Sequence, residues 1–523
     1  MSAPREIELK LEVPANSVAR LNRSSVLNGG KAASRKPATL VSVYFDTKKL
    51  KLRNSGLSLR VRRIGRQRVQ TLKEESGHSD SLVARHEWEQ EIGGKQPELD
   101  ALQHTTLEPL LGKKLRRRLI PLFETRIQRT VYPIHKGDSE IELTVDRGKI
   151  EAGSRSSSLC EVELELKRGE LADLFRTARE LAKQVPAQLA VTSKAERGYS
   201  LLAGNEPEAI KAAPVALTPD SSCEASFRMI ARACLRQLVA NRSAMLGGDA
   251  EGLHQMRVAL RRLRATISLF SDMLADSQTQ EMKAQFKWIS GELGPAREFD
   301  VFFRRVLLPV AHDKPERPGV AVLSDDLQQK REEAFHRAHT AVESARFRGL
   351  MIDTAAWIEA GDWSRNADDG PCTLRQKPIA ALAADELSRR WKTILKRGVR
   401  IKDLDAQRRH KLRIQAKKLR YASEFFAGAF PGKKPRQCRE DFLTGLERLQ
   451  DALGDLNDIT VHEGLTERIA DTQETNGKGR RGRAKKAFAA GRLAGREEAR
   501  VASVLKDAQH AYRVFAKTKP FWR

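Results

Sequence analysis

Cysteine, aromatic residues and long apolar runs are all scarce in this chain of 523 residues. The cysteines are odd in number and lack CxxC spacing, which excludes a disulfide framework and a thiolate metal site and predicts a reducing, cytoplasmic compartment; they are Cys160, Cys223, Cys234, Cys372 and Cys438. Aromatic residues make up only 6% of the chain, which disfavours recognition of nucleic acid by base stacking. No apolar run reaches the roughly 18 residues of a membrane span. The first residues carry acids and no apolar segment, so we expect no secretory signal.

Acidic residues are also in the minority. The chain has 95 Lys and Arg against 68 Asp and Glu, a net charge of +27. The excess is +11 over residues 1–205 and +16 over the remainder, so it is not confined to one tail. A polyanionic partner is the natural inference. The length is too great for one compact core and predicts two or three domains.

The stretch Glu6-Ile-Glu-Leu-Lys10 alternates charged and apolar residues with the period of a β-strand. Glu6, Glu8 and Lys10 would then share one face. Such charges are costly to bury unless they hold ions. A divalent cation on the carboxylates and a phosphate on the lysine would account for them. An exposed, solvated charged strand is the alternative.

Similar charged faces recur along residues 1–200. We expect further strands at residues 39–45, 56–63, 68–73, 85–91, 124–131, 141–146 and 161–167. Each taken alone is typical of a solvated face. Together, as antiparallel strands closed into a barrel, they would gather the charged faces into one lumen. Basic residues there would bind an anion and acids would bind its metal, as required to hold a triphosphate along a tunnel.

An ordered set of motifs covering residues 5–203 resembles the CYTH, or triphosphate tunnel metalloenzyme, superfamily. The motifs are Glu6–Lys10, Tyr44–Thr47, Leu57–Arg62, Thr71–Lys73, Arg85–Glu89, Glu161–Glu165 and Ser193–Gly198. The resemblance implies an eight-stranded antiparallel β tunnel. It also implies hydrolysis of tripolyphosphate or thiamine triphosphate, or cyclisation of ATP, with Mg²⁺ or Mn²⁺.

The resemblance also assigns roles to individual residues. The implied metal ligands are Glu6, Glu8, Asp146, Glu161 and Glu163. The implied phosphate ligands are Lys10, Arg60, Arg62, Lys73, Arg85, Arg126 and Lys194. Catalysis would rest on Lys10, Glu6 and Glu8, through in-line attack of a metal-activated water on a terminal phosphoryl group. Lys10 either assists this water or serves only as a phosphate ligand. His86 falls on the opposite strand face from Arg85, which indicates a structural role.

Residues 204–221 contain three prolines and many small residues, which indicate a linker between a domain at 1–203 and a helical domain at 222–523. The helical part contains an internal repeat. His254–Arg264 aligns with His410–Arg420 at an offset of 156 residues, and Leu293-Gly294 answers Leu453-Gly454 at an offset of 160. Two related helical bundles are the simplest interpretation. We expect the terminal Phe521 and Trp522 to pack on the helices.

Each copy of the repeat places one histidine and three cations along one stripe of a helix. The residues are His254, Arg257, Arg261 and Arg264, and His410, Arg413, Lys417 and Arg420. A solvated basic face is the alternative, but the duplication favours a groove for a flexible polyanion. The histidine spacing does not suit a zinc site. The repeat resembles the CHAD domain, an α-helical domain linked to inorganic polyphosphate.

The sequence therefore predicts an α+β multidomain protein, with a CYTH tunnel followed by a duplicated all-α CHAD domain. The predicted function is metal-dependent hydrolysis of inorganic triphosphate, with polyphosphate as a bound partner. Adenylate cyclase or thiamine triphosphatase activity in the same tunnel is one alternative. A non-catalytic polyphosphate-binding protein is another. Nucleic acid is the less favoured polyanion, because the basic helices lack interleaved aromatic residues.

Overall fold

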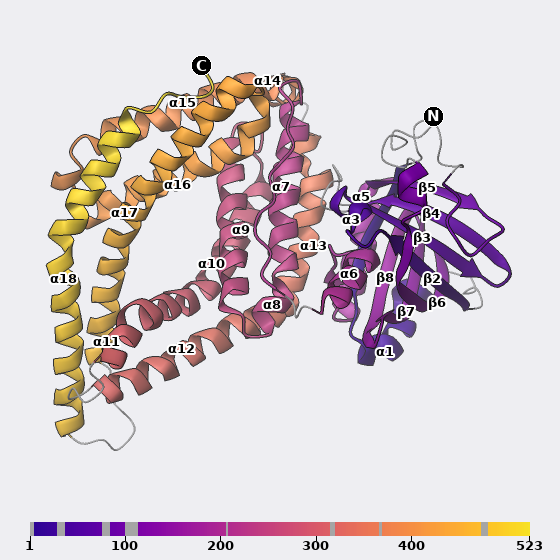
Figure 1. Cartoon of the computed structure of the whole chain (residues 1–523), viewed down its shortest axis with the longest axis horizontal. Helices are drawn as coiled ribbons and strands as arrows, with labels where there is room; N and C mark the ends of the chain where they lie inside the picture. Colours follow the sequence, from indigo (N-terminus) through magenta and orange to yellow (C-terminus); the bar gives the residue numbers. More distant parts are fainter. Residues whose placement is uncertain are drawn as a thin grey trace. The chain divides into compact units, whose positions relative to one another are not determined.

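The computed structural model describes residues 5–28, 37–75, 84–99, 113–204, 208–313, 320–365, 369–471 and 480–523. The chain forms two compact units (Figure 1). The first comprises Met1–Ala213, Arg232–Met256 and Val342–Ser364, and the second comprises Pro214–Ala231, Arg257–Ala341 and Arg365–Arg523. Residues 208–218 contain neither helix nor strand. The linker at 204–221 remains a prediction from the sequence. Within the described residues, no helix combines the length and apolar character needed to cross a membrane.

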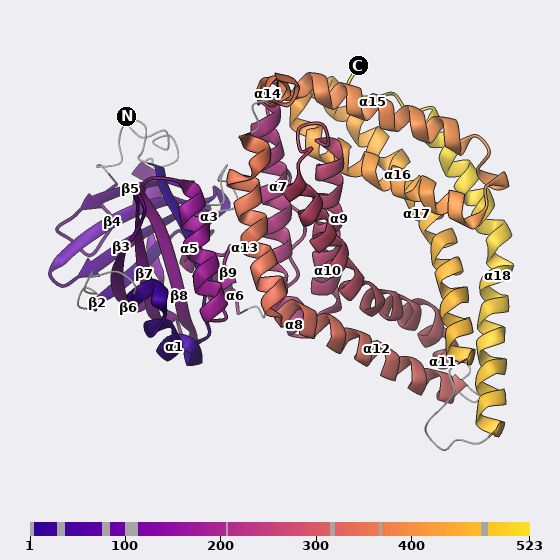
Figure 2. The ribbon, with the colours of Figure 1, turned by 180° about the vertical axis from the view of Figure 1, so that it is seen from behind.

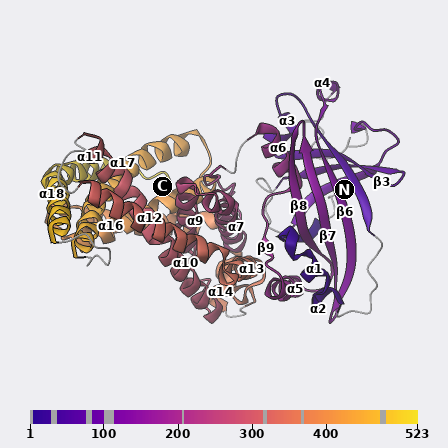
Figure 3. The same ribbon diagram turned by 90° about the horizontal axis from the view of Figure 1, so that it is seen from below.

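The first unit is built on one antiparallel sheet. Its strands are β1 Arg5–Glu12, β2 Ala38–Asp46, β3 Leu57–Ile64, β4 Gln67–Glu74, β5 Ala84–Glu91, β6 Ile120–Lys136, β7 Ser139–Ala152, β8 Arg155–Arg168 and β9 Gln188–Leu189. They lie in the order β5-β4-β3-β2-β6-β7-β8-β1-β9. The long strands β6, β7 and β8 run side by side (Figure 3). The hairpins β6–β7 and β7–β8 turn at Gly137 and Gly153, whose φ values of 56° and 61° suit two-residue hairpin turns.

Strand β1 closes the sheet on itself. One edge of β1 pairs with β8, from Glu8 opposite Glu165 to Glu12 opposite Glu161. The other edge is shared, because its first residues pair with β5 and its last two with β9. Eight strands therefore form a closed ring, and β9 is a short addition beside β1. The predicted antiparallel tunnel is confirmed, with nine strands in the described sheet rather than eight.

Short helices cover or fill the two faces of this sheet. They are α1 Val18–Asn22, α2 Ser25–Asn28, α3 Lys51–Asn54, α4 Lys113–Arg116, α5 Leu171–Gln184 and α6 Lys194–Ala203. Helix α5 packs against β8 (Figure 2). Ala195 and Tyr199 of α6 instead join a buried apolar cluster with Tyr44, Phe123 and Ile127. The start of α6 is thereby fixed beside the charged residues described below.

The remaining helices are α7 Cys223–Ala240, α8 Arg242–Leu246, α9 Ala250–Leu269, α10 Ser277–Phe302, α11 Leu308–Asp313, α12 Val320–Glu343, α13 Ala345–Ala360, α14 Asp369–Gln376, α15 Ile379–Gly398, α16 Ala406–Phe425, α17 Lys433–Asp471 and α18 Arg480–Ala516. In the second unit, α16 packs on α15 and α17, and α17 packs along α18. Phe521 and Trp522 are buried against Phe442, which also contacts Phe515. The terminal aromatic residues thus pack on the helices, as predicted.

Candidate active site and basic helical cluster

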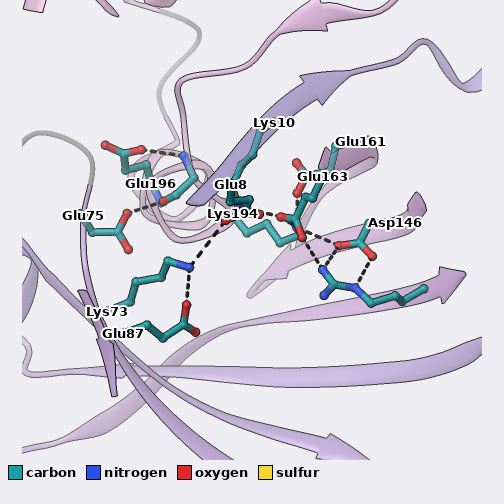
Figure 4. Close-up of polar contacts among 12 residues, drawn as sticks. Glu8, Lys10, Lys73, Glu75, Glu87, Asp146, Glu161, Glu163, Lys194 and Glu196 are labelled. Carbon is teal, nitrogen blue, oxygen red and sulfur yellow. Dashed lines mark hydrogen bonds and ion pairs between the residues drawn. The ribbon is translucent and has the colours of Figure 1, made fainter. Parts of the chain in front are cut away.

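Three buried carboxylates converge on the inner face of the closed sheet (Figure 4). Asp146 lies on β7, and Glu161 and Glu163 lie on β8; one carboxylate oxygen from each lies within 4.8 Å of the others. The strand register explains the convergence, because Asp146 pairs directly with Glu161 and paired residues point to the same face. Their side chains are 0%, 2% and 10% exposed. Three carboxylates at such burial require counter-charges.

Three cations supply those charges. The Lys194 ammonium lies 2.9 Å from Asp146 Oδ2 and 2.8 Å from Glu163 Oε1, and it also contacts Glu161. Arg129 of β6 donates two hydrogen bonds to Asp146, of 2.7 and 2.6 Å, and one of 2.5 Å to Glu163. Lys10 donates a hydrogen bond of 2.6 Å to Glu163. Charge-assisted pairs of this kind stabilise carboxylates that burial alone would expel.

The pKa values of the three carboxyls diverge. Burial acts to raise the pKa of Glu163, but Lys10, Lys194 and Arg129 outweigh it and hold that pKa well below the ordinary value. The pKa of Asp146 is lowered in the same way, since Lys194 and Arg129 overcome burial. At Glu161 burial prevails, and its pKa is raised despite Lys194. Glu161 is therefore the carboxyl that would gain most from an additional cation.

The position of Lys194 depends on the cap of α6. Ser193 is the N-cap of this helix and forms a capping box with Glu196. The Ser193 hydroxyl also donates a hydrogen bond of 2.5 Å to Glu75, just after β4. These contacts fix the first residue of α6, so the Lys194 side chain is directed at the carboxylates (Figure 4).

A second run of charges continues round the inner face. Lys10 Nζ lies 3.2 Å from Glu8 Oε1, and Glu8 Oε2 lies 3.9 Å from Lys73 Nζ. Lys73 and Arg60 both donate to Glu87, at 2.5 and 3.1 Å. The pairing of β1 with β5 completes this run, since it brings Glu8 near the cations of β3 and β4.

Arg62 differs from its neighbours. Its Nε donates to Ser42 Oγ at 3.3 Å, and no carboxylate within the described part of the chain lies within 4 Å of its guanidinium. Burial, together with Arg60 and Arg129, lowers the pKa of Arg62 to about 10. Three arginines share this part of the lumen, and the pull of Glu89 on the pKa of Arg62 is too weak to offset the other two. The arrangement suits an anionic ligand, which would relieve the repulsion.

The structure brings most of the predicted tunnel residues together. Those on one lumen are Glu8, Lys10, Arg60, Arg62, Lys73, Asp146, Glu161, Glu163 and Lys194. The backbones of Glu6 and Arg85 pair directly across β1 and β5, but their side chains lie outside what the structure describes. His86 pairs with Arg5 in the same ladder, and its side chain is likewise outside the described part.

The prediction for Arg126 is wrong. Arg126 lies on the opposite face of β6 from Arg129, with a side chain that is 55% exposed and paired with Glu124 and Glu151. Arg129 occupies the lumen instead, directly opposite Asp146. Strand alternation offers no basis for the choice, because both faces of β6 carry basic residues and the register with β7 decides which face is inside.

Cations also converge in the second unit, where the two copies of the repeat meet. Arg261 of α9 lowers the pKa of both Arg413 and Lys417 on α16, although burial is the larger cause in each case. The pKa of Lys417 falls to about 7, and that of Arg257 falls to about 10 through burial and Arg261. We call Arg257, Arg261, Arg413 and Lys417 the central cluster. The acids Glu298 and Asp458 raise these pKa values in part, but the net shift is downward, which favours a polyanionic ligand.

The duplicated glycines explain how these arginines approach the neighbouring helices. A Cβ on Gly294 of α10 would lie 3.3 Å from Arg257, and a Cβ on Gly454 of α17 would lie 3.9 Å from Arg413. Each half of the repeat therefore sets an arginine of one helix against a glycine of the next. This equivalence supports the duplication predicted from sequence.

The outer residues of the two stripes have different surroundings. His254 is half-buried on α9, and His410 of α16 hydrogen-bonds Asn457. Arg264 is exposed, whereas Arg420 lies 3.4 Å from Glu424 and 3.7 Å from Glu447. The structure thus brings the inner cations of the stripes together and leaves the outer ones in unlike environments.

Both parts of the chain match known protein families. Residues 4–199 match the CYTH domain family, and residues 229–467 match the CHAD domain family. An inorganic triphosphatase of Haemophilus influenzae is 31% identical over 162 residues, which cover 31% of this chain and 46% of that protein. The chain thus spans about half the length of this curated relative.

The similar solved structures include two examples. The CHAD domain of the plant Ricinus communis is 27% identical with a TM-score of 0.49, and the match covers 58% of this chain and 96% of that chain. A Hippeastrum protein with a dominant triphosphatase activity is 23% identical with a TM-score of 0.30, over 37% of this chain and 95% of that chain. The chain thus contains a CYTH domain, matched by residues 4–199, followed by a CHAD domain, matched by residues 229–467.

Proposed function

We propose that the CYTH domain hydrolyses inorganic triphosphate to diphosphate and phosphate with Mg²⁺ or Mn²⁺, and that the CHAD domain binds inorganic polyphosphate. The observation that carries the first part is the lumen itself, where a buried acid trio adjoins an arginine that has no carboxylate partner among the described residues. The Haemophilus influenzae relative supports inorganic triphosphate as the substrate. The second part rests on the central cluster.

The acid trio fits a hard divalent cation. Asp146, Glu161 and Glu163 offer only oxygen donors, within 4.8 Å of one another, and such donors suit Mg²⁺ and Mn²⁺. Glu8 is joined to the trio through Lys10 and is the next candidate ligand. A divalent cation bound there would neutralise phosphate charge and lower the pKa of a coordinated water.

The cations of the lumen would bind and orient the substrate. Arg60, Arg62 and Lys73 line one side of the inner face and can donate to phosphate oxygens. Arg129 and Lys194 hold the carboxylates in place from the other side. In the proposed reaction, water attacks the terminal phosphorus in line, the bond to the bridging oxygen breaks and diphosphate leaves. The fixed cations stabilise the charge that spreads over the phosphoryl oxygens.

The role of Lys10 follows its contacts. Its ammonium donates to Glu163 and lies 3.2 Å from Glu8. A donor held between two carboxylates is well placed to bridge them to a phosphate oxygen. We therefore propose that Lys10 acts as a phosphate ligand, and we keep assistance to the attacking water as the alternative.

The test is phosphate release by purified protein with Mg²⁺ or Mn²⁺, on tripolyphosphate, thiamine triphosphate, ATP and long-chain polyphosphate. We expect fast release from tripolyphosphate that EDTA abolishes, and loss of release in Glu163→Gln. Release that survives EDTA would contradict the metal assignment. Formation of cyclic AMP from ATP would favour the cyclase alternative. No turnover of any substrate, with polyphosphate binding retained, would favour a non-catalytic binding protein.

A further inference from the structure

The outer end of the α9–α10 pair contains a basic cleft. It has a volume of about 440 Å³ and is lined by Arg264, Ser268 and Ser271 from α9 and the residues that follow it, and by Lys283 and Lys287 from α10. Neither lysine belongs to the stripes predicted from sequence. Within the described residues, no carboxylate lies within 4 Å of the charged groups of Arg264, Lys283 or Lys287. Three cations therefore face one hollow without an anionic partner.

Further positive charge lies next to this cleft. Arg390 of α15 is buried and donates to the backbone oxygen and the hydroxyl of Ser268, at 3.2 and 3.4 Å. Lys418 has a lowered pKa through burial and through Arg390 and Arg264. Two carboxylates in this region are engaged by neighbouring groups: Glu386 by Arg390, and Asp272 by the Ser271 hydroxyl. The surroundings thus favour an anion in the cleft.

The equivalent end of the second half carries an acid where this cleft has a lysine. At the offset of 160 residues, the buried residues Met282, Phe286 and Ile289 correspond to the buried residues Phe442, Leu446 and Leu449. The same alignment places Glu447 where α10 has Lys287. Arg420, the counterpart of Arg264, lies 3.7 Å from Glu447. Burial and Glu447 raise the pKa of the nearby Asp451, which indicates a concentration of acids. The duplication is therefore asymmetric in charge.

The cleft continues the stripe that begins at the central cluster. Arg257, Arg261, Arg264 and Ser268 follow one another at helical spacing on one side of α9. The 12 residue steps from Arg257 to Leu269, the last residue of α9, correspond to about 18 Å along the helix axis. A chain of phosphates that follows this stripe would have a cationic side chain within reach along its whole length. Along α16, the same path would meet Glu447.

We propose that polyphosphate bound at the central cluster extends along α9 into this cleft, where Lys283 and Lys287 bind its phosphates, and does not extend towards Glu447. This inference rests on the proposed binding of polyphosphate by the CHAD domain. It gives the bound chain a direction and adds two ligands to those predicted. A flexible polyanion without bases suits the site, because the cleft residues include no aromatic side chain for stacking.

The test compares variants of the full-length chain in a binding assay with fluorescently labelled long-chain polyphosphate, in EDTA. Lys283→Ala/Lys287→Ala should weaken binding about tenfold and lower the slope of log affinity against log salt by about 1.4, if each lysine meets one phosphate. The control Lys506→Ala/Arg513→Ala removes the same charge from exposed positions of α18 and should bind normally. Glu447→Lys should tighten binding, because it would open a second path.

The outcomes separate this inference from the function on which it rests. Normal binding by Arg257→Ala/Arg261→Ala/Arg413→Ala/Lys417→Ala would overturn polyphosphate binding at the central cluster, and with it the path. Loss in that variant, combined with normal binding by Lys283→Ala/Lys287→Ala, would overturn the path alone. Stronger competition by single-stranded RNA than by unlabelled polyphosphate would also overturn the proposal, since the cleft would then serve a nucleic acid.

Discussion

Replacing Arg62 by methionine should stabilise the CYTH domain and abolish triphosphate turnover. Burial, Arg60 and Arg129 lower the pKa of Arg62 to about 10, which is roughly 2.5 below the ordinary value for arginine. A pKa difference of one corresponds to about 1.4 kcal/mol, so keeping this guanidinium charged costs about 3 kcal/mol at most. Partial exposure to solvent reduces the cost to about 1–2 kcal/mol. Methionine keeps much of the apolar stem and removes the charge.

The sign of this effect follows from the direction in which the pKa moves. Arg62 is a base whose pKa is lower in the folded state, so the folded state resists its protonation. At neutral pH the group is charged in both the folded and unfolded states, and the full cost is present. The cost declines only above about pH 10, where the folded state releases the proton. A stability gain in Arg62→Met is therefore expected at pH 7.

Thermal unfolding and phosphate release measure the two effects separately. We expect Arg62→Met to raise the melting temperature by about 2–6 °C and to lower turnover at least about 100-fold, as for loss of one preorganised donor. Arg126→Met is the matched control, because Arg126 is an exposed arginine outside the lumen, and it should change neither quantity. A lower melting temperature for Arg62→Met would contradict the electrostatic reasoning. Retained turnover would contradict a role for Arg62 in substrate binding.

Three further predictions concern the other charges. Arg129→Met should lower both stability and turnover, since it leaves Asp146 and Glu163 buried with fewer partners. Thermal unfolding and phosphate release measure the two effects, and an unchanged melting temperature and turnover would refute the pairing. Polyphosphate binding should weaken between pH 6 and pH 8, because the pKa of Lys417 is about 7 and its ammonium is lost as pH rises. Affinity measured across this range should fall for the wild type and stay constant for Lys417→Met; the same fall in both proteins would contradict the assignment to Lys417. Replacing the four residues of the central cluster and the two histidines His254 and His410 by alanine should weaken polyphosphate binding and spare tripolyphosphate turnover, and a parallel loss of turnover would tie the two sites together.

The sequence predicted the class of fold and much of the lumen for a physical reason. Alternation along a strand states which residues share a face, so Glu8 with Lys10, and Glu161 with Glu163, could be grouped without a structure. What alternation cannot supply is the register between strands and the choice of the inner face. Arg126 and Arg129 lie on opposite faces of β6, and only the pairing of Arg129 with Asp146 shows which face is inside.

Prediction of the helical site from sequence was limited in a similar way. Helical periodicity identified the stripe of Arg257 and Arg261, and the duplication identified its counterpart on α16. Neither signal reports what the neighbouring helix contributes. Lys287 and Glu447 occupy equivalent positions with opposite charge. This difference acquires a meaning only in the structure, where Lys287 of α10 lies beside Arg264 and Glu447 of α17 lies beside Arg420.

Closure of the sheet by β1 has a consequence for the order of assembly during synthesis. Strand β1 leaves the ribosome before the rest of this sheet and pairs with β8, whose partner residues follow 149 to 157 positions later. Until then β1 can pair with β5 only, through Arg5–Ile7, and the ring is open. Contacts this distant in sequence form slowly, because a long loop must close before they contribute. The nascent chain therefore closes the ring only after β8 has emerged, and an incomplete chain cannot assemble the full set of charges.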